Sequence, residues 1–211
     1  FLIRNCEISN QTNANGGIKF YNVTNGTVAN VRIHDASFSF AISYSDTCKI
    51  ENSSFSNIKF GDSCTYTDGF RLLNNTFKKC GKDDQRPTLV RYSTDINIIG
   101  NSFDTTGGLW IDSNQGPVGL ADNKIANSWL GMRIDSTPRG VIQNNTVSDC
   151  TYPFRLNPSL LSHYELFNIT PDNMIDNRPI RYLVNESNQV ISTNWSFLGI
   201  INSKNITAKD I

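Results

Sequence analysis

Two aspartates, Asp112 and Asp135, each follow an isoleucine at the end of a short apolar segment. If these segments stack in register, the carboxylates lie one above the other, and Arg133 faces outward on the same strand as Asp135. Hydrolases and lyases that act on polysaccharides use such carboxylates for acid–base chemistry, often beside a basic side chain. Asp112, Asp135 and Arg133 are therefore the candidate catalytic residues.

A structural interpretation of these aspartates is strong. Acidic residues at strand ends are ordinary turn formers. The sequence has neither a hydrolase signature that contains histidine nor a dense aspartate cluster of the kind that binds Ca²⁺ in lyases. The balance leans against an enzyme, with polysaccharide hydrolysis or lysis as the fallback.

Aromatic side chains near the same segments suggest glycan binding without turnover. Trp110 lies two residues before Asp112, and Trp129 and Tyr92 flank the region. Large flat rings beside a basic group such as Arg133 can hold a sugar without any reaction. Trp110, Trp129 and Tyr92 are therefore the candidate glycan-binding residues.

No metal or cofactor is expected, and neither calcium nor copper is supported. Copper needs clustered His, Met or Cys side chains, whereas His34, His163, Met132 and Met174 do not occur at pair spacing. The five cysteines lack CxxC spacing, which argues against a zinc site. Their odd number allows at most two disulfides.

The composition limits the possible classes of protein. With 211 residues and 23.6 kDa, the chain has room for one domain. Equal numbers of basic and acidic residues, 19 of each, give no electrostatic reason to bind nucleic acid. No run of 18 apolar residues could span a membrane. Asn, Ser and Thr make up 65 of the 211 residues, which indicates many turns.

A repeat runs through most of the chain. A six-residue pattern first appears at 3–8: a branched apolar residue, any residue, Asn (or Gly or Asp), two further residues and an apolar residue. The first seven copies are separated by 25, 22, 22, 26, 22 and 22 residues and start at Ile3, Val28, Ile50, Leu72, Ile98, Leu120 and Ile142. A fixed period of this kind is the signature of a stacked repeat architecture.

The repeat predicts an all-β fold. Each period also holds a second apolar pair spaced by two residues, such as Ile42/Tyr44, Cys64/Tyr66 and Val90/Tyr92, which indicates another short strand. Short strands that keep one phase between Asn, Gly and Ser corners predict a parallel β-helix with about 22 residues per coil. The rule for parallel crossovers makes this single-stranded solenoid right-handed.

The pattern also predicts the core and the corners. The first and sixth positions face inward: Ile50, Phe55, Leu72, Phe77, Ile98, Phe103, Leu120, Ile125, Ile142 and Val147. Among these, Phe55, Phe77 and Phe103 form an aromatic stack. The third position takes a left-handed backbone. Its asparagines are expected to form a ladder whose amides bind the backbone of neighbouring coils: Asn5, Asn30, Asn52 and Asn74.

One continuous domain is expected, in three parts. Residues 1–157 form regular coils, 158–198 form irregular coils with loop insertions, and 199–211 resume the coil. The segment Pro158–His163 is expected to be a loop or a short helix.

Asn-x-Ser/Thr sequons indicate possible glycosylation of an extracellular protein. There are ten, at Asn10, Asn22, Asn25, Asn52, Asn74, Asn144, Asn168, Asn185, Asn194 and Asn205. A repeated turn motif that contains Asn-x-Thr would create the same sequons without any glycan, so both explanations stay open.

Two groups of residues carry a resemblance to known families. Leu73-Asn-Asn-Thr-Phe77 and Ile99-Gly-Asn-Ser-Phe103 resemble the β-helix repeats shared by carbohydrate-binding and sugar-hydrolase proteins. The segment 173–188 is similar to NosD-type domains, which are common in exported archaeal and bacterial proteins. The resemblance implies an exported protein and names no reaction, and copper handling is known for only part of that family.

The expected role is that of a secreted or cell-surface module with a structural or adhesive function. The alternative is a glycan-binding module or an enzyme that acts on surface polysaccharide. Because both termini stop inside the repeat without a cap, the partners expected at the ends are neighbouring coils of a longer chain or other copies of this one. Such copies could assemble end to end into a filament or sheath.

Overall fold

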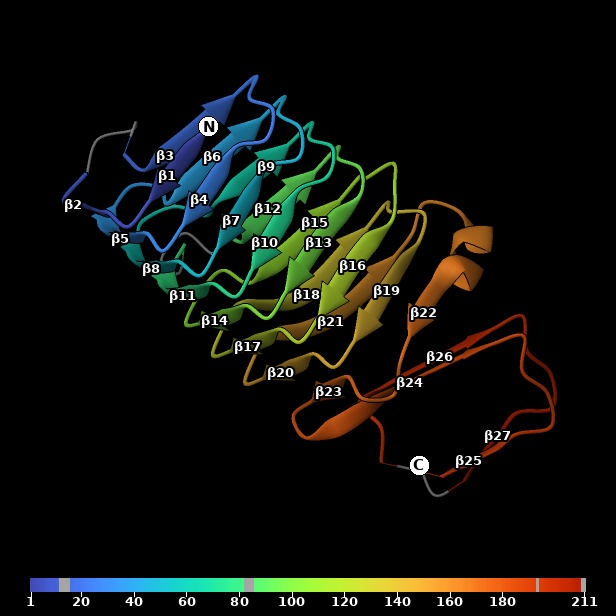
Figure 1. The fold of residues 1–211 in the computed structure, drawn as a ribbon. Helices are drawn as coiled ribbons and strands as arrows, with labels where there is room; N and C mark the ends of the chain where they lie inside the picture. Colours follow the sequence, from blue (N-terminus) through green and yellow to red (C-terminus); the bar gives the residue numbers. More distant parts are fainter. Residues whose placement is uncertain (12–15, 82–85, 193, 210–211) are drawn as a thin grey trace.

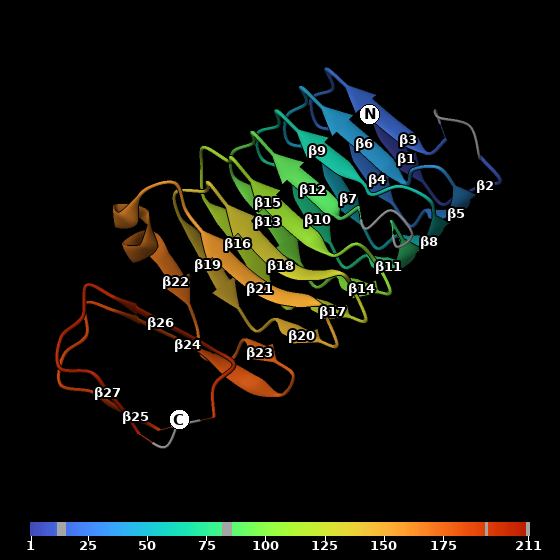
Figure 2. The same cartoon turned by 180° about the vertical axis from the view of Figure 1, so that it is seen from behind.

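The computed structural model describes residues 1–11, 16–81, 86–192 and 194–209. The chain winds into a solenoid of about 7 turns, in which equivalent residues lie about 22 apart. Figure 1 shows the coils following one another from the N-terminal end toward the C-terminal end, and Figure 2 shows the same stack from behind. The predicted parallel β-helix is confirmed.

Three sheets form the faces of the solenoid. Sheet A has the order β1 (Leu2–Arg4), β4 (Thr27–Ala29), β7 (Lys49–Glu51), β10 (Arg71–Leu73), β13 (Ile96–Ile99), β16 (Val118–Ala121), β19 (Gly140–Gln143) and β22 (Phe167–Ile169). Sheet B begins with β2 (Glu7–Ser9), β5 (Arg32–Ala36), β8 (Ser54–Ile58), β11 (Thr76–Cys80), β14 (Ser102–Asp104), β17 (Lys124–Ala126), β20 (Thr146–Ser148) and β23 (Met174–Ile175). Sheet C contains β3 (Ile18–Tyr21), β6 (Phe40–Ser43), β9 (Ser63–Thr65), β12 (Thr88–Arg91), β15 (Leu109–Asp112), β18 (Leu130–Asp135) and β21 (Tyr152–Asn157).

The C-terminal part departs from the parallel stack. A 3-10 helix, η1 (Leu161–Leu166), precedes β22, and β23 pairs antiparallel with β24 (Arg178–Val184). Two parallel pairs follow, β24 with β26 (Phe197–Ile201) and β25 (Val190–Ser192) with β27 (Thr207–Lys209). This part extends away from the regular coils (Figure 1). No helix within the described ranges is long and apolar enough to cross a membrane.

The predicted core is confirmed. All ten side chains expected to face inward are at most 1% exposed. The ring centroids of Phe55 and Phe77 lie 4.8 Å apart, and those of Phe77 and Phe103 lie 4.7 Å apart with an interplanar angle of 5°. Because parallel strands repeat at about 4.8 Å, equivalent rings of successive coils meet face to face.

The predicted asparagine ladder lies one residue later in the repeat. The third position does have left-handed backbone, with φ between 49° and 55° at Asn5, Asn30, Asn52 and Asn74, but these side chains are exposed. The buried ladder occupies the fourth position and consists of Asn75, Asn101, Asn123, Asn145 and Asn173. In each step the side-chain oxygen of one asparagine accepts the backbone N–H of the asparagine one coil earlier, at 2.9–3.0 Å. The predicted bonding of side-chain amides to the backbone of neighbouring coils is therefore confirmed. The residues predicted to form it were wrong.

The second strand of three coils ends earlier than predicted. Sheet C aligns Ile42, Cys64 and Val90 in one buried column. The tyrosines two residues later lie beyond the strand ends, at a corner with left-handed backbone. Tyr44, Tyr66 and Tyr92 are therefore exposed corner residues and not strand residues.

One inward position of sheet C holds a carboxylate. Asp62 is 1% exposed and occupies the column of Phe40, Thr88 and Leu109. Its Oδ1 accepts hydrogen bonds from the Ser39 N–H at 3.1 Å, the Phe40 N–H at 3.2 Å and the Ser39 hydroxyl, while Oδ2 has no partner among the described residues. Burial raises the pKa of Asp62 from 3.8 to about 6.

We expect the Asp62→Asn variant to gain more stability at pH 7.5 than at pH 4.5. Below pH 3.8 both states of the wild type are protonated, so the shift has no effect. Between pH 3.8 and about 6 the unfolded state ionises while the folded state keeps its proton, so the wild type loses stability progressively, by on the order of 3 kcal/mol in total. Urea unfolding of both proteins at the two pH values measures the difference, with exposed Asp149→Asn as the control. A gain that does not change with pH would contradict the prediction.

Candidate functional site

The outer face of sheet C carries most of the predicted site residues. Pairing of β15 with β18 sets Trp110 opposite Arg133 and the two candidate aspartates opposite each other, so their predicted stacking is confirmed. Arg91 on β12 lies opposite Asp112. Its Nε donates to Asp112 Oδ2 at 2.9 Å, and an Nη2 of the same guanidinium lies 2.7 Å from that oxygen.

Asp135 organises the centre of this face. Its Oδ2 accepts hydrogen bonds from Arg133 Nε at 2.5 Å and from Trp110 Nε1 at 3.1 Å. Arg155 Nε lies 3.1 Å from Oδ1, within ion-pair distance. The carboxylate is buried, with the residue 5% exposed. Asp135 therefore holds two arginines and a tryptophan in place, instead of presenting a free acid–base group to solvent.

The Trp110 ring lies between guanidinium groups. Arg133 Cζ is 4.2 Å from its centroid and Arg91 Cζ is 5.7 Å away. Because β12 and β18 lie on opposite sides of β15, the two cations flank the ring, in cation–π contacts. Trp110 thus fixes the arginines, and its faces are covered by them. We call Arg91, Trp110 and Arg133 the arginine–tryptophan cluster.

A column of exposed tyrosines continues this face toward the N-terminal end. Tyr44, Tyr66 and Tyr92 are 54%, 47% and 41% exposed. Their rings stack at 4.9 Å and 5.0 Å, and Tyr21 meets Tyr44 edge-on at 5.6 Å. The Arg91 guanidinium lies 5.4 Å from the Tyr92 ring, which joins the column to the arginine–tryptophan cluster. These four residues form what we call the tyrosine column.

Three of these tyrosines have a backbone conformation that bulky residues rarely adopt. Their φ angles are 51°, 53° and 52° at Tyr44, Tyr66 and Tyr92. Such a conformation costs on the order of 1–3 kcal/mol for a residue other than glycine. The same corner position in other coils is filled by Asn22, Ser113 and Ser136, so the fold itself does not need tyrosine there.

A pocket of about 440 Å³ lies at the other end of the face. Its lining consists of Trp129, Leu130, Arg133, Tyr152, Pro153, Phe154 and Arg155. The Trp129 and Tyr152 rings meet edge to face, with centroids 5.9 Å apart and an interplanar angle of 88°. The structure therefore brings two predicted residues, Trp129 and Arg133, into one concave site beside the arginine–tryptophan cluster.

Six residues of this face were not among the predicted site residues: Tyr21, Tyr44, Tyr66, Arg91, Tyr152 and Arg155. A signal was present, because Tyr44, Tyr66 and Tyr92 recur at 22 and 26 residues, in phase with the repeat, and each is followed by Ser or Thr. Tyrosines that recur in phase with the repeat lie one above another in a column, because equivalent residues of successive coils stack. Because each tyrosine also completes an apolar pair spaced by two residues, the pattern predicted a strand residue there instead of an exposed column.

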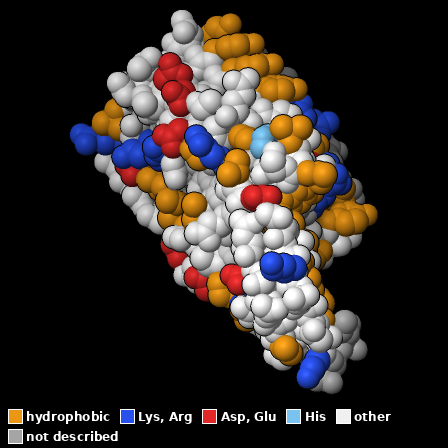
Figure 3. All heavy atoms as spheres, turned by 90° about the vertical axis from the view of Figure 1, so that its right-hand side faces the viewer, with side chains coloured by type: hydrophobic (Ala, Val, Ile, Leu, Met, Phe, Trp, Pro, Cys, Tyr) orange, Lys and Arg blue, Asp and Glu red, His pale blue; other side chains and the backbone are white. Residues whose placement is uncertain are grey.

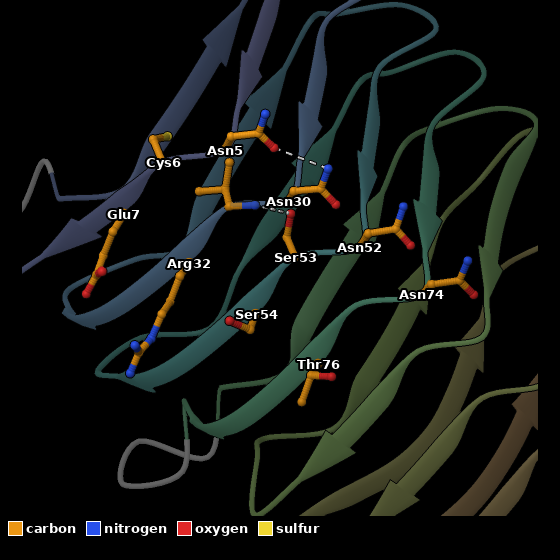
Figure 4. Close-up of a pocket in the computed structure, with 11 residues that line it drawn as sticks. Asn5, Cys6, Glu7, Asn30, Arg32, Asn52, Ser53, Ser54, Asn74 and Thr76 are labelled. Carbon is orange, nitrogen blue, oxygen red and sulfur yellow. Dashed lines mark hydrogen bonds between the residues drawn. The ribbon is translucent and has the colours of Figure 1, made fainter.

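A second hollow follows the corner between sheets A and B. It is a shallow polar groove of about 730 Å³, lined by the exposed asparagines together with Cys6, Glu7, Arg32 and hydroxyl side chains. Figure 4 shows Asn5, Asn30, Asn52 and Asn74 in one row, with a hydrogen bond between the first two. Nothing in this groove concentrates charge or aromatic rings, so the candidate site remains on sheet C.

The possible copper ligands are dispersed. Within the described residues, no three His, Cys, Asp or Glu side chains form a group that could hold a metal ion. The His34 ring nitrogens each lie 2.6 Å from a carboxylate, of Asp35 and Glu7, and these hydrogen bonds raise the pKa of His34. Met132 is buried in the core. All five cysteines are free thiols, of which Cys48, Cys64 and Cys80 are buried.

All ten sequon asparagines are exposed, including Asn74 and Asn144. Every one except Asn168 has positive φ and therefore belongs to a turn. Accessibility allows glycosylation, and the turn geometry equally explains why these sequons recur, so glycosylation stays a prediction.

Charge is mixed on the face of the molecule that Figure 3 shows. The space-filling view shows basic and acidic side chains interspersed, with a stepped row of hydrophobic side chains along its upper edge (Figure 3). This agrees with the net charge of zero.

Comparison with known proteins supplies the family. No curated protein matches the sequence. A family model described as "Periplasmic copper-binding protein (NosD)" matches residues 2–164, which are 163 of the 211 residues and include every regular coil up to β21 and most of η1. The match agrees with the β-helix and with the envelope location expected for an exported protein. The chain therefore belongs to the NosD family.

Proposed function

We propose that this protein is a periplasmic or extracellular β-helix module that adheres to polysaccharide through the outer face of sheet C. The tyrosine column carries the proposal. Three neighbouring coils hold stacked, exposed tyrosines at positions with left-handed backbone, where Asn would cost less free energy. Tyrosine has an apolar ring and a polar hydroxyl, which together suit contact with sugars.

The shape of the face favours an extended ligand. The tyrosine column, the arginine–tryptophan cluster and the pocket follow one another along the solenoid, from β3 to β21. Six intervals of about 4.8 Å give the strip a length of about 29 Å. A linear polymer laid along the strip would meet tyrosine hydroxyls first and arginines at the far end.

Copper binding is not part of this proposal. The family description names copper, but among the residues that the structure describes no three His, Cys, Asp or Glu side chains form a group that could hold a metal ion. End-to-end assembly and a filament or sheath role stay predictions, since the proposed adhesion needs only one copy.

We expect the triple variant Tyr44→Asn, Tyr66→Asn and Tyr92→Asn to lose at least about 10-fold in polysaccharide affinity. Each ring contributes about 0.5–1.5 kcal/mol in aromatic contacts. Asparagine tolerates the left-handed backbone, so the variant should remain folded. Affinity electrophoresis against cellulose, chitin, polygalacturonate and alginate measures binding, with Val141→Asn on the exposed face of sheet A as the control. The absence of binding to every polymer, or equal binding by the triple variant, would contradict the proposal.

A further inference from the structure

We infer that the pocket between β18 and β21 binds an acidic sugar residue, whose negative group is a carboxylate or a sulfate ester. This inference rests on the proposed polysaccharide binding and names the chemistry at one end of the strip. The volume of about 440 Å³ lies within the usual range for small-ligand sites, about 300–1,000 Å³.

The charges of the lining select for an anion. Arg133 and Arg155 contribute two guanidinium groups, and among the described residues no Asp or Glu belongs to the lining. The one carboxylate that neutralises them, Asp135, is buried behind them and is shared with Trp110. Two cations against one carboxylate leave a positive charge at the pocket.

The arginines retain donors for a ligand. The shortest contact of each arginine with Asp135 is through Nε, at 2.5 Å and 3.1 Å. A guanidinium has five N–H donors, so the Nη groups can bind further oxygens. The Arg155 side chain is 54% exposed, which makes these donors accessible, and paired N–H groups match the two oxygens of a carboxylate or sulfate.

The aromatic walls suit the sugar ring. Tyr152 is 59% exposed, and the perpendicular arrangement with Trp129 leaves ring surface beside the two arginines. A ring with an anionic substituent can therefore contact an aromatic side chain and form an ion pair with a guanidinium group, whereas a neutral sugar brings no charge and a small inorganic anion brings no ring.

Calorimetry with three matched oligosaccharides tests this inference: tetragalacturonate, its neutral carboxyl-reduced form, and the sulfated derivative of that neutral form. We expect at least one acidic form to bind the 211-residue chain about 10-fold or more tightly than the neutral form, and this binding to weaken as salt rises from 50 to 500 mM. Comparison of the two acidic forms identifies whether a carboxylate or a sulfate is preferred.

Two variants separate charge from ring contact. Arg155→Gln should bring the affinity for the acidic form down to the level of the neutral form and leave neutral binding unchanged, whereas exposed Arg139→Gln on β19's side of the solenoid should change nothing. Tyr152→Ala should weaken acidic and neutral forms alike. Equal affinity for all three sugars, or an Arg155→Gln variant that keeps the preference, would overturn the acidic pocket. If neutral polymers still bind and the triple tyrosine variant abolishes this, the proposed adhesion stands without it.

Discussion

Replacing Phe77 by alanine is expected to lower the free energy of unfolding by about 3–5 kcal/mol. Phe77 is fully buried and lies between Phe55 and Phe103, with centroid distances of 4.8 Å and 4.7 Å. The neighbouring coils are held by the hydrogen bonds of β8, β11 and β14, so they cannot move together to fill the space left by the ring. The cavity left by the ring is therefore expected to stay open, which keeps the loss within the range of about 3–5 kcal/mol that is typical of Phe→Ala substitutions in a core.

Denaturant unfolding measures this loss against a neighbouring control. Lys78 is the next residue, is exposed and belongs to the same strand, so Lys78→Ala should change stability by less than about 0.5 kcal/mol. Phe77→Leu, which keeps much of the volume, should fall between the two. A Phe77→Ala variant that loses less than about 1 kcal/mol would show that the aromatic stack does not support the core.

Replacing Asn123 by alanine is expected to lower the free energy of unfolding by about 3–5 kcal/mol, because it removes buried hydrogen bonds. The side-chain oxygen accepts the Asn101 backbone N–H at 3.0 Å, and Nδ2 donates to the Ile98 carbonyl at 2.7 Å and to Asn145 Oδ1 at 2.9 Å. Alanine leaves buried partners without hydrogen bonds, each at about 1–3 kcal/mol.

Asn168→Ala provides the matched control for the ladder. Asn168 lies on a strand of the same solenoid, β22, but is exposed. Its replacement should change the urea midpoint little, while Asn123→Ala should lower it strongly. Equal midpoints for the two variants would mean that water satisfies the groups that the ladder now binds.

The core could be predicted from the sequence because it depends on a simple periodicity. Side chains in a strand alternate between faces, and the 22-residue interval places Ile50 and Leu72 in one column. Short strands that keep these positions in phase over seven copies are typical of a β-solenoid. The same logic placed Asp112 opposite Asp135, since only the register of two strands was needed.

The asparagine ladder was misplaced because the first three copies of the repeat have Asn at the third position and none at the fourth, which holds Asn only from Asn75 onward. At Asn74–Asn75 and Asn144–Asn145, one residue takes the left-handed backbone and the other turns inward, and composition alone does not tell which. The variation among the later copies of the repeat does show which position turns inward. The third position becomes Gly100 in one coil, and glycine has no amide to contribute, whereas the fourth position keeps Asn101 there.

The pocket and the role of Asp135 could not be predicted, because they depend on side-chain directions. That Arg133 and Arg155 share one carboxylate, and that Trp110 donates to it, follows from rotamers across three strands. Asp62 likewise contradicts the inward pattern, since two backbone N–H groups and the Ser39 hydroxyl make a carboxylate acceptable there.

The asparagine ladder gives the molecule a direction of growth. The Asn123 side chain makes most of its hydrogen bonds with the coil before it, to Asn101 and Ile98, and the same holds for the Asn145 side chain with Asn123 and Leu120. Each new coil therefore brings the asparagine side chain that binds the backbone N–H and carbonyl groups of the coil before it. Those backbone groups are already in place when the new coil docks. A chain that emerges N-terminus first from a ribosome or a translocation channel can add its coils in the order of emergence, with each docked coil opposing backward slippage of the segment behind it.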